Sequence, residues 1–323
     1  MPDAPSSSAA PFPKELGADG AFRRQESVFR DRVTADGSSG FPAQAGRYHL
    51  YVSLACPWAH RTIIYRRLRG LEDAISMTIV DPERDERGWA IREGEGNTPD
   101  PVNGFAFLSE AYLRSDPSFE GRVTVPALWD TVTGRVVNNE SSEVIRMLDR
   151  EFAAFARRPE PLFCPPELEA EIDEVNAFVY DNVNNGVYKC GFAVTQAAYE
   201  AAFHALFDAL DVLERRLATR RYLVGARITE ADWRLFTTLV RFDPVYVGHF
   251  KCNLRRISDH PNLSGYLRDL YQQPGVAGTV NLDHIKRHYY RTHLTINPTR
   301  VVPAGPALDW DAPHGREALG DAA

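Results

Sequence analysis

Residues 48–71 read YHLYVSLACPWAHRTIIYRRLRGL, and this stretch decides the fold of the first half of the chain. Residues 48–53 are aromatic and β-branched, which predicts a strand. Pro57 suits the first turn of a helix, because the N–H that proline lacks is not needed there. Gly70 can end that helix in the left-handed conformation. Cys56 therefore stands where a strand is followed by the N-terminus of a helix.

The segments downstream extend this unit. Residues 74–80 alternate apolar and polar side chains and predict a second strand, so that strand, helix and strand form a βαβ unit. Residues 123–129 and 135–137 predict a hairpin with a tight Thr-Gly turn. Residues 139–149 predict a helix that begins with capping side chains. The order βαβ followed by ββα, with a proline in the third strand, resembles the thioredoxin fold.

The second half of the chain has the periodicity of helices. Apolar residues recur at helical spacing through residues 167–217. Residues 229–232 form a variant capping box that opens another helix, and residues 263–272 predict one more. We therefore expect an α+β thioredoxin-like domain followed by an all-α domain.

The length of 323 residues favours two domains, at about 150 residues each. We place the domain boundaries where the hydrophobic pattern and the proline content of the sequence change. We divide the chain into an N-terminal arm (1–45), the thioredoxin-like domain (46–155), a proline-rich linker (156–166), the helical domain (167–302) and a C-terminal tail (303–323).

Composition excludes several classes of protein. No segment approaches the roughly 18 apolar residues of a membrane span, and the N-terminus lacks the basic and apolar regions of a signal peptide. Lysine and arginine number 37 against 44 acidic residues, a net charge of −7, whereas a nucleic-acid-binding protein usually has a basic excess. We expect a cytoplasmic protein with neither a membrane nor a nucleic acid as its partner.

The cysteines point to thiol chemistry rather than to disulfides or zinc. Cys56, Cys164, Cys190 and Cys252 lie far apart and show no metal-site spacing, which is typical of reduced thiols in a cytoplasm. The partial positive charge of a helix N-terminus stabilises a thiolate, and so would the arginines that follow Cys56 in its helix. The alternative is that Cys56 is a small buried hydrophobic residue, followed by a solvated helix face.

Ala59 occupies the position where a dithiol redox protein carries its resolving cysteine. A mixed disulfide on Cys56 would therefore need an outside thiol, and glutathione is the natural candidate. In the thioredoxin fold the Val125–Pro126 peptide bond is cis, and the backbone of Val125 can pair with a peptide. Glu140 and Ser141, at the next helix start, could hold the γ-glutamyl end, although both also suit ordinary capping. In this order, the features resemble a glutathione transferase.

Four blocks are similar to the glutathionyl-hydroquinone reductases, the Xi class of glutathione transferases. They are residues 48–71, 122–148, 185–193 (NGVYKCGFA) and 284–290 (HIKRHYY), within a match over about residues 20–305. The resemblance places the catalytic cysteine on Cys56 and implies a homodimer. It places the substrate-pocket aromatics on Trp89, Tyr188 and Tyr289, with both tyrosines assisting the chemistry, and the glutathione contacts on Trp89, Arg122, Val125, Pro126, Glu140 and Ser141.

The resemblance implies that glutathionyl-hydroquinones are reduced through a Cys56–glutathione mixed disulfide, which a second glutathione resolves. The alternatives are an omega-like thioltransferase or dehydroascorbate reductase, and a non-catalytic interaction module. From sequence alone, Tyr188 and Tyr289 could also be core tyrosines. His284 and His288 are four residues apart, but no third ligand is in view, so we expect them on a helix surface and expect no metal.

Overall fold

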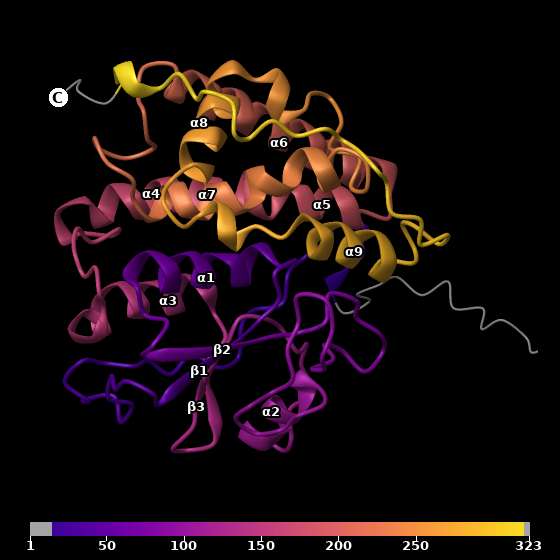
Figure 1. Ribbon diagram of the computed structural model, residues 1–323. Helices are drawn as coiled ribbons and strands as arrows, with labels where there is room; N and C mark the ends of the chain where they lie inside the picture. Colours follow the sequence, from indigo (N-terminus) through magenta and orange to yellow (C-terminus); the bar gives the residue numbers. More distant parts are fainter. Residues whose placement is uncertain (1–14, 320–323) are drawn as a thin grey trace, which may run out of the picture.

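The computed structural model describes residues 15–319 and has two halves (Figure 1). The first half contains β1 (Tyr48–Val52), α1 (Pro57–Arg69), β2 (Ile75–Ile79), α2 (Leu108–Ser115), β3 (Ala127–Asp130), β4 (Arg135–Asn138) and α3 (Ser141–Arg146). The second half contains α4 (Glu169–Val179), α5 (Gly186–Phe192), α6 (Gln196–Leu217), α7 (Glu230–Arg241), α8 (Pro261–Tyr271) and α9 (Leu282–Thr292). The expected α+β domain followed by an all-α domain is confirmed.

The four strands form one mixed sheet in the order β2-β1-β3-β4. β1 pairs parallel with β2 and antiparallel with β3, and every residue of β1 is buried, as its run of apolar and aromatic side chains requires. α1 and α3 lie between the sheet and the helical half, and α2 lies on the far side of the sheet (Figure 1). The N-terminus of α1 thus faces the junction between the halves.

Capping residues in the sequence correctly predict the ends of α1 and the start of α7. Pro57 opens α1, and Gly70 ends it with a φ of 66° while its N–H bonds the carbonyls of Arg66 and Arg67. At the start of α7 the Thr229 N–H donates to Asp232 at 2.7 Å, which confirms the capping box. No helix within residues 15–319 is long and apolar enough to cross a membrane.

Two element boundaries differ by more than two residues from the sequence prediction. The third strand begins at Ala127 rather than at residue 123, because Pro126 has no N–H to donate to a ladder and the segment before it runs along a cavity. α3 ends at Arg146, and the chain continues to Glu151 in a wider π-helical turn.

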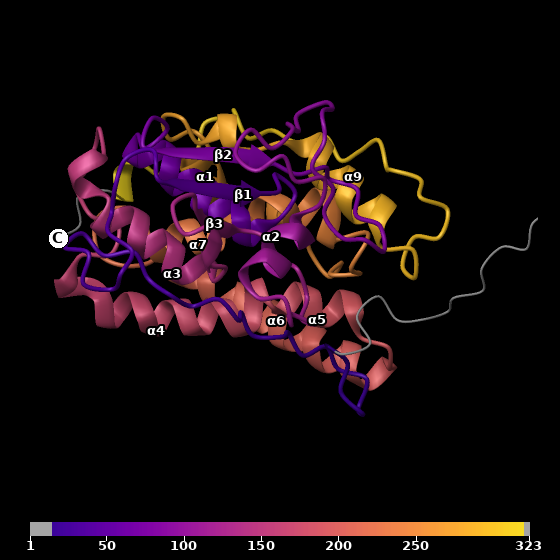
Figure 2. The same cartoon turned by 90° about the horizontal axis from the view of Figure 1, so that it is seen from below.

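The described part of the N-terminal arm packs against both halves of the molecule. The Phe29 carbonyl accepts a hydrogen bond from the Asn139 N–H at 3.0 Å, and the Gly20 carbonyl accepts one from the Val194 N–H at 3.1 Å. Four apolar side chains anchor the segment in the core: Phe22, Phe29, Val33 and Phe41. Figure 2 shows this indigo segment crossing from the sheet domain to the helical domain.

An arginine of the helical half fixes the turn that precedes Cys56. Arg241 of α7 is fully buried and donates to the carbonyls of Leu54 at 2.9 Å and Ala55 at 2.8 Å. Its guanidinium also lies 3.0 Å from the ring of His60 in α1. The position of the cysteine therefore depends on the contact between the two halves.

Candidate active site

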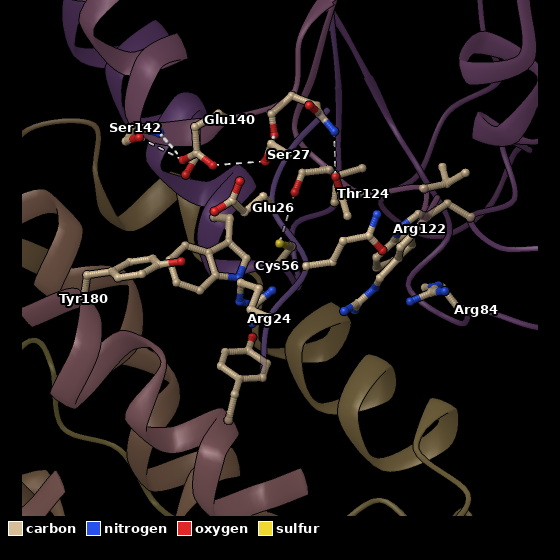
Figure 3. A pocket seen from close by; sticks show the side chains of 18 of the residues that line it. Arg24, Glu26, Ser27, Cys56, Arg84, Arg122, Thr124, Glu140, Ser142 and Tyr180 are labelled. Atoms are coloured by element: carbon tan, nitrogen blue, oxygen red, sulfur yellow. Dashed lines mark hydrogen bonds between the residues drawn. The ribbon is translucent and has the colours of Figure 1, made fainter. Parts of the chain in front are cut away.

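A cavity of about 410 Å³ lies where the two halves and the N-terminal segment meet. Most of the predicted site residues line it, and they come from six separate parts of the chain. They are Cys56, Trp89, Arg122, Val125, Glu140, Ser141, Tyr188 and Tyr289. Pro126 is not among the lining residues found within the described chain. Figure 3 shows Cys56 between the Glu140 carboxylate on one side and Arg122 and Arg84 on the other.

Cys56 is the N-cap residue of α1 and has extended backbone angles (φ −79°, ψ 123°). Its thiol is half-buried at the cavity, and Sγ lies 3.5 Å from the carbonyl oxygen of Val125. The first turn of α1 contains no acidic residue, so nothing there opposes the positive helix end. The other three cysteines are buried, and all four are free. Cys56 is thus the thiol placed for attack on a molecule in the cavity.

Arg61 follows Cys56 in α1 and is buried rather than solvated. Its guanidinium donates to Ser141 Oγ at 3.3 Å and to Asn184 Oδ1 at 2.9 Å. Arg61 therefore links the cysteine helix to α3 and to the helical half, and the expectation of a solvated helix face was wrong at this position.

Glu140 caps α3 and presents its carboxylate beside the cavity. One oxygen accepts from the Ser142 N–H at 3.0 Å and from Ser142 Oγ at 2.8 Å, and the other accepts from Ser27 Oγ at 3.0 Å. Burial acts to raise the pKa of Glu140, but these hydrogen bonds and the nearby Arg61 outweigh it and leave the pKa below its usual value. The carboxylate therefore stays ionised and can receive an ammonium group.

The Val125–Pro126 peptide bond is cis, as expected. Tyr112 holds the segment before it, because its hydroxyl donates to the Thr124 carbonyl at 2.7 Å. The backbone of Val125 is thereby kept beside Cys56 at the edge of the cavity.

Three tyrosine hydroxyls meet at the other side of the cavity. Tyr188 of α5 and Tyr289 of α9 have hydroxyl oxygens 2.6 Å apart, and that of Tyr246 lies 3.1 Å from Tyr289. Burial raises the pKa of Tyr188, with the charge of Cys56 as the next contribution, and burial raises the pKa of the other two well above the usual value. All three hydroxyls therefore remain protonated donors. Tyr246 was not predicted from the sequence, because it lies just after α7 in a stretch that carries no distinguishing signal.

Trp89 is buried at the cavity wall, and its ring already has neighbours. The His288 ring stacks on it at 5.0 Å with an interplanar angle of 21°, and the Arg84 guanidinium lies 5.2 Å from its centre. The indole is therefore packed between the loop after β2 and α9.

The prediction that His284 and His288 lie on a helix surface was wrong. Both are buried, because the loop after β2 covers this side of α9. His284 Nε2 lies 2.7 Å from the Glu95 carbonyl, and His288 Nδ1 lies 2.7 Å from the Pro82 carbonyl. Burial lowers the pKa of His288 to about 3, so this imidazole is neutral. Within residues 15–319 no group of three or more potential ligands could hold a metal ion.

Two charged residues of the N-terminal segment, neither of them predicted from the sequence, contact residues that line the cavity. Arg24 lies 4.8 Å from the ring centres of both Trp58 and Tyr188 and donates to Asn185 Oδ1 at 2.9 Å. Glu15 is buried, and its carboxylate accepts from Arg122 at 2.7 Å. The cavity is thus completed by a segment that the sequence predicted only as an N-terminal arm.

Comparison with known proteins agrees with this architecture. Residues 55–151 match the N-terminal domain of the glutathione S-transferases, and residues 196–269 match their C-terminal domain. The chain is 53% identical over 305 residues to the glutathionyl-hydroquinone reductase YqjG of Escherichia coli, covering 92% of this chain and 93% of that protein. It is 52% identical over 288 residues to the glutathionyl-hydroquinone reductase PcpF of Sphingobium chlorophenolicum, covering 89% and 90%.

Solved structures give the same result. The glutathione-bound structure of YqjG has a TM-score of 0.87 at 52% identity, covering 92% of this chain and 97% of that one. The Xi glutathione transferase of Phanerochaete chrysosporium has a TM-score of 0.85 at 50% identity, covering 88% and 97%. The chain therefore belongs to the glutathione S-transferases and, within them, to the glutathionyl-hydroquinone reductases of the Xi class.

Proposed function

We propose that this protein reduces glutathionyl-hydroquinones to hydroquinones, with glutathione as the reductant. The observation that carries the proposal is the placement of Cys56 at a helix N-terminus, in one cavity with the hydrogen-bonded hydroxyls of Tyr188 and Tyr289. A nucleophilic thiol faces donors that suit an oxygen-bearing aromatic leaving group. The names of the relatives at 52–53% identity support the same activity.

Glutathione would bind along the sheet-domain wall of the cavity. The Val125 backbone would pair with the tripeptide next to the cis Pro126, and Glu140 and Ser141 would hold the γ-glutamyl end. Arg122 would bind a carboxylate at the other end, and Trp89 would border it. This arrangement directs the sulfur of the bound glutathionyl group toward Cys56.

In the first step the Cys56 thiolate attacks the sulfur of the glutathionyl group. The bond between sulfur and the aryl carbon breaks, and its electron pair goes to that carbon, which takes up a proton. The products are the hydroquinone and a Cys56–glutathione disulfide. Tyr188 and Tyr289 would donate hydrogen bonds to the ring oxygens and pass the proton, because burial keeps both phenols protonated.

In the second step the thiolate of a free glutathione attacks the glutathionyl sulfur of this disulfide. Glutathione disulfide leaves, and the Cys56 thiolate is restored. Taken together, one glutathionyl-hydroquinone and one glutathione yield one hydroquinone and one glutathione disulfide. Ala59 rules out a C-x-x-C partner, so the resolving thiol comes from outside.

The test is a comparison of substrates on the purified protein. Glutathione consumption is measured with glutathionyl conjugates of benzo-, naphtho- and menadiol-type hydroquinones, beside dehydroascorbate and hydroxyethyl disulfide. Faster turnover of the aryl conjugates than of dehydroascorbate and hydroxyethyl disulfide supports the proposal. Turnover of dehydroascorbate or the disulfide alone would favour the omega-like alternative, and an unreactive Cys56 with no turnover would favour a non-catalytic interaction module.

We also propose that the protein works in the cytoplasm as a homodimer, in the detoxification of quinones. The four free cysteines fit a reducing compartment, and a homodimer is what the class resemblance implies. The division at residues 45, 155, 166 and 302 remains our proposal for the domain boundaries. Light scattering of the purified chain tests the dimer directly.

A further inference from the structure

The loop after β2 brings Arg84 to the wall of the cavity. The Arg84 N–H donates to Thr292 Oγ1 at 3.3 Å, which ties the residue to the end of α9. Its side chain lines the cavity, and its guanidinium lies 5.2 Å from the centre of the Trp89 ring. Figure 3 shows Arg84 beside Arg122, across Cys56 from Glu140.

Arg84 differs from its neighbours because its guanidinium has no hydrogen bond or ion pair with any residue of the 15–319 range, and its Nε is buried without a partner. The acids around it are engaged elsewhere: Asp81 with Arg92, Asp85 with Arg87, Glu15 with Arg122, and Glu83 with Arg287, Arg291 and Arg300. A partly desolvated cation without a counter-ion is unfavourable, and an anionic ligand would relieve that cost.

The negative groups that act on Arg84 are the Glu15 and Asp85 carboxylates and the Cys56 thiolate, but none of them is hydrogen-bonded to its guanidinium within residues 15–319. His288 and His293 are neutral, because burial lowers the pKa of both. Burial, followed by the repulsion of Arg122, lowers the pKa of Arg84 to about 10, so it is still protonated at neutral pH. Arg24, another arginine that lines the cavity, is engaged with Asn185 and two aromatic rings.

The position of Arg84 indicates which part of a substrate it meets. In the proposed function, Glu140 and Ser141 hold one end of glutathione and Arg122 holds the other. Arg84 lies beside Trp89, which the resemblance places both in the glutathione site and in the aromatic pocket, and its backbone is bound to the end of α9, the helix that carries Tyr289. An aromatic ring bound between Trp89 and Tyr289 would therefore lie next to Arg84. We propose that Arg84 is an anion subsite for the hydroquinone ring, so that the protein prefers glutathionyl-hydroquinones bearing a carboxylate. This inference rests on the proposed function.

The test compares two substrates that differ at one ring substituent. They are the glutathionyl conjugates of 2,5-dihydroxybenzoate, which carries a carboxylate, and of methylhydroquinone, which carries a methyl group. For the unaltered protein we expect kcat/KM to be higher for the carboxylate, with a preference that declines as NaCl is added. In Arg84→Met the ratio of the two kcat/KM values should fall on the order of tenfold, and Arg84→Lys should restore part of it.

Arg87→Met is the matched control, because Arg87 lies in the same loop, is exposed and is paired with Asp85. The ratio should be the same in this variant as in the unaltered protein. An equal loss on both substrates in Arg84→Met would show that Arg84 serves glutathione or the fold, and the proposal would be rejected. An unchanged ratio would reject it as well.

Failure of the proposed function can be distinguished from failure of the anion subsite. If the unaltered protein turns over neither conjugate, calorimetry with 2,5-dihydroxybenzoate and methylhydroquinone in the presence of glutathione still tests the subsite. Tighter binding of the carboxylate that is lost in Arg84→Met supports the anion subsite without the reaction. Equal binding of the two rings overturns it.

Discussion

The two walls of the cavity are built in different ways. On the sheet-domain wall, Cys56 and Glu140 are each the capping residue of a helix, so their positions follow from short stretches of sequence. On the helical-domain wall, Tyr188 and Tyr289 contact each other and Tyr246, although the three come from distant segments. The proposed nucleophile is placed locally, and the groups proposed to assist the leaving ring are placed by tertiary packing. This difference predicts which variants affect every substrate and which affect only aromatic ones.

The largest effect is expected for Cys56→Ser, which should reduce turnover of every substrate by at least on the order of 10³-fold. A serine hydroxyl is far less acidic than a thiol and forms no mixed disulfide. Glutathione binding, followed by calorimetry, should largely persist because the Val125, Glu140 and Ser141 contacts remain.

Cys164→Ala is the control, since that cysteine is buried away from the cavity lining. It should keep full activity in the folded protein. Substantial reduction of a glutathionyl-hydroquinone by Cys56→Ser would contradict the mechanism. Iodoacetamide mapping should also label Cys56 faster than the three buried cysteines.

On the helical-domain wall, substitutions are expected to slow the reaction of aromatic substrates selectively. Tyr188→Phe and Tyr289→Phe should each slow reduction of glutathionyl-hydroquinones on the order of 10²-fold, because an aryl carbon leaves poorly without donors at its ring oxygens. Hydroxyethyl disulfide should be spared, since a thiolate leaves without such help. Because the two hydroxyls lie 2.6 Å apart, the double variant should lose less than the sum of the single losses.

The measurement is kcat/KM on both substrates for the three tyrosine variants. If both activities fall in parallel, these tyrosines support the fold or bind glutathione. The helical-domain wall would then have no selective role in the departure of the aromatic ring.

Tyr246→Phe is expected to reduce activity less than the other two tyrosine substitutions do. Tyr246 contacts Tyr289 through its hydroxyl at 3.1 Å but does not line the cavity. Its removal should cost only about three- to tenfold on glutathionyl-hydroquinones, equivalent to about 1 kcal/mol for one neutral hydrogen bond. A loss as large as that of Tyr289→Phe would mean that Tyr246 itself serves the transition state.

The smallest expected effect is a pH-dependent change in stability, and it concerns Glu140 on the sheet-domain wall. Because the pKa of Glu140 is below its usual value of 4.5 in the folded protein, its ionised form stabilises the fold above that pH. This contribution is lost as pH falls through the folded pKa. The difference in unfolding free energy between the unaltered protein and Glu140→Gln should therefore shrink as pH is lowered below about 4.5. A pH-independent difference, measured by denaturant unfolding, would show that the charge of Glu140 does not contribute.

The accuracy of the sequence predictions follows the same division. The succession of βαβ and ββα units along the chain, the start of α1 at Pro57, its end at Gly70 and the capping box of α7 were all predicted, because each depends on hydrophobic period or on residues a few positions apart. The extension of the third strand was wrong, since the segment before Pro126 borders a cavity rather than a neighbouring strand.

By itself, the sequence determined a thioredoxin-like unit with a single cysteine at a helix start, followed by helices. Backbone hydrogen bonding and turn geometry are local properties, and short motifs specify them. Only the tertiary structure decided that Arg61 and His288 are buried, that Glu15 pairs with Arg122, and that Arg84 is left without an acidic partner within the described chain. Whether a charged or aromatic side chain finds water, a counter-ion or another ring depends on which distant segment covers it, and that is settled only when the two halves and the N-terminal segment pack together.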